Sequence, residues 1–351
     1  MPLKAAIIGA GHIARQHLAC LRELPGVRVA GVCDLSRAMA ESAADRFGVD
    51  RWYTDHRKML DEAKPDVVHI TTPPPSHFSL SMDALNAGAH VIVEKPATVH
   101  YDDLLTLARR ANETGRVLLE DYNYVFNTEI QKILALVESG EFGAVTHVEC
   151  FICLDILAPG NPFVDPNAPH PALSMAGGAI ADFLTHLASL AHAFVGAHRA
   201  VRSVWSKRSN NHPLPSDEFR ALADCERGTA SLGFSAHTQP DVFSVRVYGT
   251  RMRAVANLFE PFLSIDRVHA GPRPLIPLRN GRQAAKDNRR AAYGGLWRKL
   301  SGGPGAYEGL WELVGRTYRA IERSAPPPIS AQAIEDVNRL VADLKKQEYT
   351  L

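Results

Sequence analysis

The feature that most restricts the fold of this chain is a glycine-containing run near the N-terminus, Gly9-Ala10-Gly11-His12-Ile13-Ala14. It follows an apolar segment at 5–8 that is typical of a buried strand, and it opens a segment at 14–24 with the apolar spacing of a helix. In such a unit the first glycine makes the tight turn, the second lets a pyrophosphate approach, and a small third residue allows close helix packing. The helix N-terminus offers amide donors to phosphates. We therefore predict a dinucleotide site that includes Gly9, Gly11, His12 and Ile13.

A carboxylate further along the chain strengthens this prediction. Asp34 ends the second predicted strand, 27–33, at the spacing where an acid accepts hydrogen bonds from the ribose hydroxyls. Its negative charge would repel a 2′-phosphate, so the sequence favours NAD over NADP. Arg37 could accommodate that phosphate, or it could be an exposed helix residue, and NADP therefore stays possible.

The alternation of strand and helix patterns predicts an α/β fold. Short β-branched runs alternate with helical patterns up to residue 120, which is typical of a parallel sheet covered by helices. After Asn123 the pattern changes, and consecutive strand patterns between 200 and 258 predict a largely antiparallel sheet. A length of 351 residues agrees with two domains, and we place them at 1–122 and 123–351. Further helices are expected at 177–195 and at 331–346, the second capped by Ser330.

Composition excludes several classes of partner. The formal net charge of +1 favours neither nucleic acid nor a membrane surface, and we find no apolar run long enough to span a bilayer and no signal peptide. Five cysteines without an export signal predict a reduced, cytoplasmic protein. Cys150 and Cys153 lie on a predicted strand and are expected to be buried thiols, and the fifteen histidines lack zinc-site spacing. We therefore expect no metal.

One basic segment has no clear secondary structure pattern. Between Asp266 and Glu308 the cations greatly outnumber the acids, amid glycine and proline. A mobile, solvated loop is the simplest interpretation, and a site for an anionic group is the alternative. The cations are Arg267, Arg273, Arg279, Arg282, Lys286, Arg289, Arg290, Arg298 and Lys299.

Two loops should meet the ligand at the carboxyl ends of the parallel strands, where open sheets of this kind bind ligands. The first contains Thr72, Pro73 and His77, which we predict to lie beside the cofactor; an ordinary proline loop is the alternative. The second is Glu94-Lys95-Pro96. A lysine held there, beside a cationic nicotinamide, could exchange a proton near neutral pH, whereas a surface lysine would have no such role.

The predicted helix at 177–195 carries a polar stripe. Asp182, His186 and Ser189 share one face at 3.6 residues per turn, apart from the apolar face. Spacing alone does not distinguish an active site from a water-facing surface.

In combination, these motifs resemble the Gfo/Idh/MocA oxidoreductases. The resemblance rests on the glycine run, Asp34, the turn at 72–77, Glu94-Lys95-Pro96 and the GGxxxDxxxH pattern at 177–186, and it extends to Tyr248-Gly249-Thr250. It implies a Rossmann dinucleotide-binding domain followed by an α/β domain with a large, mostly antiparallel open sheet. It also implies subunit contacts through that sheet, in a homodimer or homotetramer.

The resemblance further implies an activity. Such proteins transfer hydride between NAD(P) and an alcohol or ketone of a sugar, a cyclitol or a sugar derivative. Carried to this chain, His186 would accept the hydroxyl proton, Lys95 would polarise the same oxygen, and Asp182 would orient them. The peptide bond between Lys95 and Pro96 is often cis in such proteins.

Substrate contacts are less specified. Besides Lys95, Asp182 and His186, we predict contacts from segments that should approach the cleft, namely from Tyr122, Asn123, Asp155 and His170, with Asn161 and Asp165 as further candidates. The chain also departs from the family pattern, with Val125 where an arginine is common and Ser189 where an aspartate is common. These changes place the usual substrate contacts in doubt.

Two other functional classes stay open. One is a non-redox lyase or glycosidase that uses tightly bound NAD transiently. The other is a catalytically silent protein that binds a dinucleotide or sugar, although a binding role would not need Lys95, Asp182 and His186 together.

Overall fold

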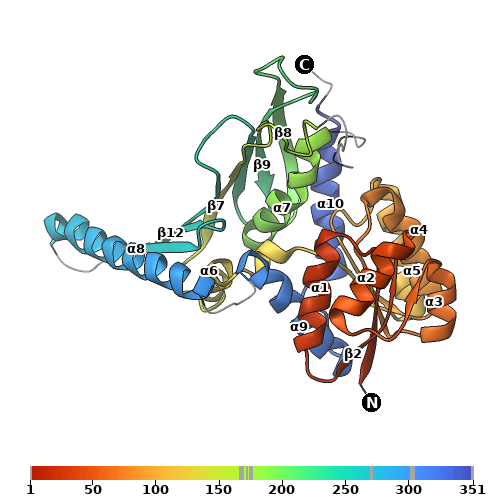
Figure 1. Cartoon of the computed structure of the whole chain (residues 1–351). Helices are drawn as coiled ribbons and strands as arrows, with labels where there is room; N and C mark the ends of the chain where they lie inside the picture. Colours follow the sequence, from red (N-terminus) through yellow and green to blue (C-terminus); the bar gives the residue numbers. More distant parts are fainter. Residues whose placement is uncertain are drawn as a thin grey trace. The chain divides into compact units, whose positions relative to one another are not determined.

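The computed structural model describes residues 2–348 apart from 166–169, 171–172, 174–176, 269–271 and 301–304. The chain forms two compact units (Figure 1). The first contains Met1–Tyr122 and Leu310–Asn338, and the second contains Asn123–Gly309 and Arg339–Leu351. The chain first leaves the first unit after Tyr122, the position at which the sequence placed its boundary. The return of Leu310–Asn338 differs from the sequence prediction, which assigned this segment to the second domain.

The first unit is built on a parallel sheet with the strand order β3-β2-β1-β4-β5-β6. Strands β1 and β4 are buried along most of their length, as expected for a sheet covered on both faces. The strand order reverses beside β1, which creates the switch point where sheets of this kind bind ligands. The strands are β1 (Leu3–Ile8), β2 (Val27–Cys33), β3 (Trp52–Tyr53), β4 (Val67–Ile70), β5 (His90–Val93) and β6 (Leu118–Glu120). The connecting helices are α1 (His12–Glu23), α2 (Arg37–Phe47), α3 (His56–Ala63), η1 (Pro74–Ser76), α4 (His77–Asn86) and α5 (Tyr101–Thr114).

Specific hydrogen bonds attach the returning segment to this sheet. It contains most of α9 (Glu308–Glu322) and the first half of α10 (Ala331–Lys345), whose Ser330 cap accepts a hydrogen bond from Ala333. The amide of Asn338 donates to the carboxylate of Glu120 at 2.6 Å, and the hydroxyl of Tyr318 lies 2.9 Å from His69 Nε2. All of these side chains are buried, so polar contacts far apart in sequence assign the segment to the first unit.

Glu120 gives a testable pH dependence of stability. Burial raises its pKa from 4.5 to about 7, although its hydrogen bonds to Asn338 and Tyr122 oppose the shift. The folded protein therefore holds this proton more tightly than the unfolded chain. The stabilising contribution is complete below pH 4.5 and is lost as the pH rises through about 7, a change of about 3 kcal/mol. We expect Glu120→Gln to flatten the pH dependence of urea unfolding between about pH 5 and about pH 8. Identical slopes in the variant and the parent would contradict this assignment.

The second unit contains a mostly antiparallel sheet with the order β13-β12-β11-β7-β10-β9-β8, in which β7 and β10 pair in parallel. The predicted α/β class, with a parallel sheet followed by a largely antiparallel one, is confirmed. Its strands are β7 (Val145–Cys153), β8 (His198–Ser206), β9 (Glu218–Cys225), β10 (Thr229–Ser235), β11 (Val242–Gly249), β12 (Met252–Asn257) and β13 (Phe262–Arg267). Its helices include η2 (Asn123–Phe126), α6 (Thr128–Glu138) and α7 (Gly178–Val195).

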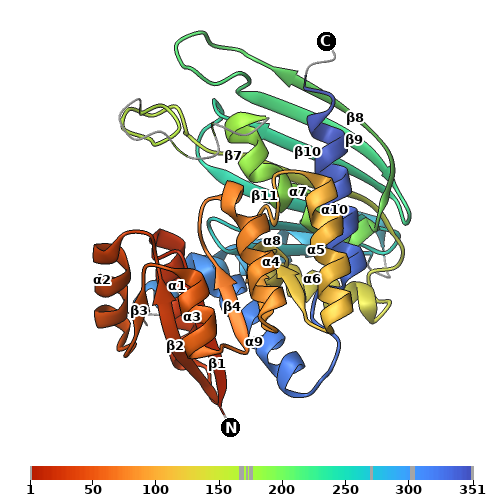
Figure 2. The same cartoon turned by 90° about the vertical axis from the view of Figure 1, so that its right-hand side faces the viewer.

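Helix α7 forms the centre of this unit by packing on β7 and β10 (Figure 2). By length and composition it could cross a membrane, but 78% of its apolar window is buried inside the protein. Burial in the core therefore explains its composition. The five cysteines are free and buried, which confirms the prediction for Cys150 and Cys153.

Residues 276–300 of the basic segment form a helix, so the predicted loop is wrong there, although the cations Arg279, Arg282 and Lys286 are exposed to solvent as expected. Helix α8 (Ile276–Leu300), labelled in Figure 1, follows the short η4 (Arg273–Leu275) and packs along β13, the edge strand of the sheet. Pro277 lies in the first helical turn, where a missing amide costs little. Gly281 and Gly294 lower helix propensity by about 1 kcal/mol each and obscure the pattern, but packing against β13 supports the helix.

Candidate functional site

The glycine turn has the geometry that a dinucleotide requires. Gly9 has a φ of +96°, and a Cβ there would lie 2.8 Å from the carbonyl carbon of Thr71, so only glycine fits. A Cβ on Gly11 would meet nothing within 4 Å, which leaves the backbone open to a phosphate. Gly11 is also the N-cap of α1 and provides no side-chain hydrogen bond to the first amides. Since His12 and Ile13 begin this helix, the residues present fit a pyrophosphate at its N-terminus.

The carboxylate of Asp34 lies beside this turn, at the end of β2. One oxygen accepts a hydrogen bond from the Ala10 amide at 2.8 Å, and the other accepts from the Ser36 amide at 2.8 Å. Asp34 is therefore fixed next to the glycine turn, as the ribose interaction requires. Arg37, in contrast, stacks over Trp52 at 5.1 Å, pairs with Glu41 and has a side chain that is 73% exposed. This placement favours the exposed-helix interpretation of Arg37.

The turn at 72–77 and the loop after β5 are joined by a buried histidine. His77 Nε2 lies 2.7 Å from the carbonyl oxygen of Thr72, and Nδ1 lies 2.8 Å from that of Pro96. Burial lowers the pKa of His77, and a neutral ring can donate to one of these carbonyls at a time. His77 therefore positions both loops from behind, while Thr72 and Pro73 lie on the turn itself. Direct cofactor contact by these three residues stays a prediction.

Lys95 lies two residues after the end of β5, and its peptide bond to Pro96 is cis, as the resemblance implied. Glu94 beside it ends a chain of buried hydrogen bonds. Its carboxylate lies 3.0 Å from His17 Nε2, His17 Nδ1 lies 2.8 Å from His69 Nδ1, and His69 Nε2 lies 2.9 Å from the hydroxyl of Tyr318.

One donor in this chain of hydrogen bonds can be assigned. Burial and then the charge of His17 lower the pKa of His69 well below its usual value, so His69 is neutral. Burial would raise the pKa of Glu94, but the hydrogen bond and charge of His17, followed by the charge of Lys95, hold it below its ordinary value. An ionised Glu94 only accepts, so Nε2 of His17 donates to it.

Sequence reasoning missed His17 and His69. The available signal was a histidine inside an otherwise apolar strand, Val67-Val68-His69-Ile70, where an unpaired polar group would be costly. The partners lie on α1 and α9, at separations of 52 and 249 residues from His69. Spacing along one helix or strand does not reveal such contacts.

In the second unit, α7 carries Asp182 and His186. His186 is 8% exposed and Ser189 is 3% exposed, so these two residues of the polar stripe do not face water. The ring of His186 packs edge-on against Tyr124 of η2 with centroids 4.7 Å apart, which explains the burial. Asp182, one turn earlier, is partly exposed. The helix thus presents an imidazole from an apolar setting next to a more accessible carboxylate.

The remaining predicted substrate residues have separate environments. Tyr122 is 3% exposed and donates to Glu120 at 2.9 Å, so it belongs to the core of the first unit, and its predicted substrate contact is not supported. In the second unit, Asn123 accepts from the Tyr124 amide, and Asp155 accepts from Gln239. His170 stacks on Phe163, and Asn161 caps the Phe163 amide. Asp165 is partly exposed, and its amide donates to the carbonyl of Asn161 at 3.0 Å.

The predicted catalytic set therefore comes from both units. Lys95 belongs to the first unit, and Asp182 and His186 belong to the second. Their convergence stays a prediction.

Comparison with known proteins places both units in one family. A model described as an oxidoreductase family with an NAD-binding Rossmann fold matches residues 3–122, and one described as a GFO/IDH/MocA C-terminal domain matches residues 130–255. The chain belongs to the Gfo/Idh/MocA oxidoreductase family. In this Gfo/Idh/MocA protein the Rossmann match covers the glycine turn, Asp34 and Lys95, and the C-terminal match covers Asp182 and His186.

Individual relatives match parts of this family member. D-glucoside 3-dehydrogenase of Escherichia coli is 31% identical over 145 residues, which are 41% of this chain and 41% of the relative. Levoglucosan dehydrogenase of Pseudarthrobacter phenanthrenivorans is 27% identical over 66% of this chain and 61% of the relative. The alignments thus span less than two thirds of either relative. A structure of levoglucosan dehydrogenase with NADH and levoglucosan superposes with a TM-score of 0.77 at 18% identity, over 100% of this chain and 98% of that one. At this identity the likeness shows the fold.

Proposed function

We propose that this protein is an NAD-dependent dehydrogenase or reductase acting on an alcohol or ketone of a sugar, cyclitol or sugar derivative. The observation that carries the proposal is the open backbone at Gly11, at the switch point of a parallel sheet, with Lys95 after β5, two strands from β1 in the same sheet. The relatives named above are dehydrogenases of a glucoside and of levoglucosan, which supports a carbohydrate-like substrate.

The residues would divide the work as follows. A bound nicotinamide supplies the hydride chemistry. His186 would accept the proton of the reacting hydroxyl, and its apolar setting beside Tyr124 makes solvent a weaker competitor for that proton. Lys95 would hold the same oxygen and stabilise negative charge that develops on it. Asp182, being more exposed than His186, would orient the substrate hydroxyl and the imidazole.

The experiment that tests the proposal is a screen of substrates by nicotinamide absorbance. Glycosides, anhydrosugars, inositols and nucleotide sugars would be mixed with the protein and either NAD or NADP. Net nicotinamide reduction with one of them supports a dehydrogenase. Product without any net nicotinamide change would instead favour a lyase or glycosidase with transient redox, and binding without product would favour a silent sensor.

NAD is proposed over NADP because of Asp34. We expect Asp34→Ser to weaken NAD binding by about tenfold to about a hundredfold. A serine hydroxyl can still accept the hydrogen bond from the Ser36 amide, but it cannot offer two charged acceptor oxygens to a ribose. NADP binding should weaken less, because the repulsive charge is also removed. Titration calorimetry with both dinucleotides measures this, with the exposed Asp50→Ser as a control. An unchanged ratio of the two affinities would contradict the role of Asp34.

We also propose a homodimer or homotetramer in the cytoplasm. The open sheet supports the assembly, because Val204 on β8 and Leu222 on β9 are 52% and 58% exposed and would be covered by a second copy. The five free, buried cysteines support a reducing compartment.

A further inference from the structure

We propose that His212, Asp217 and His237 bind a divalent transition-metal ion, at a site separate from the dinucleotide turn. The group lies within the second unit, where His212 and Asp217 belong to the connection between β8 and β9, and His237 belongs to the connection between β10 and β11. Local spacing gave no sign of it, because the ligands come from two loops. The sequence expectation of no metal rested on such spacing.

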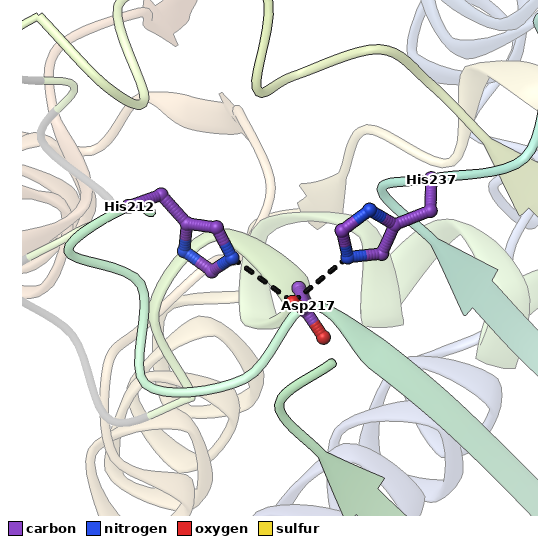
Figure 3. A group of neighbouring side chains, drawn as sticks. All are labelled: His212, Asp217 and His237. Carbon is purple, nitrogen blue, oxygen red and sulfur yellow. Dashed lines mark hydrogen bonds and ion pairs between the residues drawn. The ribbon is translucent and has the colours of Figure 1, made fainter. Parts of the chain in front are cut away.

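The donor atoms of the three side chains lie close together. His212 Nε2 lies 2.9 Å from Asp217 Oδ2, and His237 Nε2 lies 2.8 Å from the same oxygen. The donor atoms all lie within 4.8 Å of one another. Figure 3 shows the two rings directed at the carboxylate from opposite sides. Two imidazoles and a carboxylate are a donor set suited to zinc, iron, cobalt or nickel.

The carboxylate is crowded by donors in a way that a cation would relieve. Oδ2 lies within 3.0 Å of both ring nitrogens and of the Ser209 amide, and the Arg208 amide bridges both oxygens at 2.7 and 3.0 Å. A carboxylate oxygen offers about two lone pairs, so Oδ2 faces more N–H groups than it can accept. With a bound ion, both rings would present lone pairs to the metal, and Oδ2 would make one metal bond in place of two ring hydrogen bonds.

The dimensions and burial also suit an ion. Zinc bonds of about 2.0–2.2 Å place neighbouring ligand atoms roughly 3 Å apart, close to the separations of Asp217 from each ring. The Asp217 side chain is 0% exposed and that of His212 is 4% exposed, so these two ligands are fixed in the protein. His237 is 35% exposed, which leaves one side of the site open to water or a small ligand. Three protein ligands and an open position describe an ion site that also ties the two connections together.

The test uses the full chain after chelator treatment, titrated with Zn²⁺ in a calorimeter and with Co²⁺ under visible absorption. We expect one ion per chain, Co²⁺ bands typical of nitrogen and oxygen ligands, and a raised melting temperature with Zn²⁺. His237→Ala should lower the affinity by more than about a hundredfold, because it removes a direct ligand. The exposed His100→Ala serves as a matched control and should bind the ion normally.

Two results would overturn the site: no stoichiometric binding by the parent chain, or equal Co²⁺ spectra in the parent and His237→Ala. Because Asp217→Asn could fail to fold, the half-exposed His237 carries the test, and His212→Gln adds a second ligand variant. None of these measurements depends on the proposed dehydrogenase activity.

Discussion

Replacing Lys95 or His186 by alanine should lower turnover by about 10²-fold to about 10⁴-fold, the range that positioned proton transfer contributes. The two side chains come from the end of β5 and from the buried helix α7, and neither belongs to the glycine turn. We therefore expect NAD affinity to change little in both variants. Initial rates on the substrate found by screening, with NAD binding measured separately, provide the test.

The matched control for His186 is His192→Ala, because His192 lies on the same helix and is only partly buried. For Lys95, Lys95→Arg keeps the charge but changes the geometry, and it should restore little activity if placement matters. Near-parental turnover in both alanine variants would refute the assigned catalytic roles, and the evidence for dinucleotide binding would be unaffected. A loss of NAD binding in either variant would point to a structural effect.

His69→Leu should destabilise the protein by about 2–5 kcal/mol. His69 is 0% exposed and is the middle member of the buried chain of hydrogen bonds, so its loss leaves His17 and Tyr318 each without a hydrogen-bond partner at that position. Each buried polar group left unsatisfied costs about 1–3 kcal/mol. Urea unfolding at constant pH measures the change in the free energy of unfolding.

Two further variants provide a scale for this loss of stability. Tyr318→Phe removes only the terminal hydroxyl of the chain of hydrogen bonds and should cost less than His69→Leu. His56→Ala removes a partly exposed ion pair with Asp83 and should cost less than about 1 kcal/mol. If His69→Leu lowered the free energy of unfolding no more than His56→Ala, the chain of hydrogen bonds would make no special contribution to stability.

The parts of the fold that sequence predicts well are those encoded locally. The glycine turn, the strand that ends at Asp34 and the helix that begins after Ser330 each depend on neighbours within a few residues. The two-sheet architecture follows from the order of these local patterns. The cis bond at Lys95 came from family resemblance.

The parts that sequence missed depend on distant contacts. The pattern on α7 suggested a polar face, but Tyr124 covers His186. Glycines weaken the helical sequence pattern of α8, and packing against β13 stabilises this helix. His69 meets partners on α1 and α9, and Asp217 meets a ring from another loop. In each of these cases a partner outside the local pattern decides the outcome.

The return of Leu310–Asn338 has a consequence for biosynthesis. The Rossmann sheet is complete after residue 120, yet Tyr318 and Asn338, which satisfy buried polar groups behind it, are translated roughly 200 residues later, at about 5–20 residues per second. During that interval the nascent first unit keeps His69 and Glu120 without those partners. The first unit therefore reaches its final fold only after Asn338 has been translated.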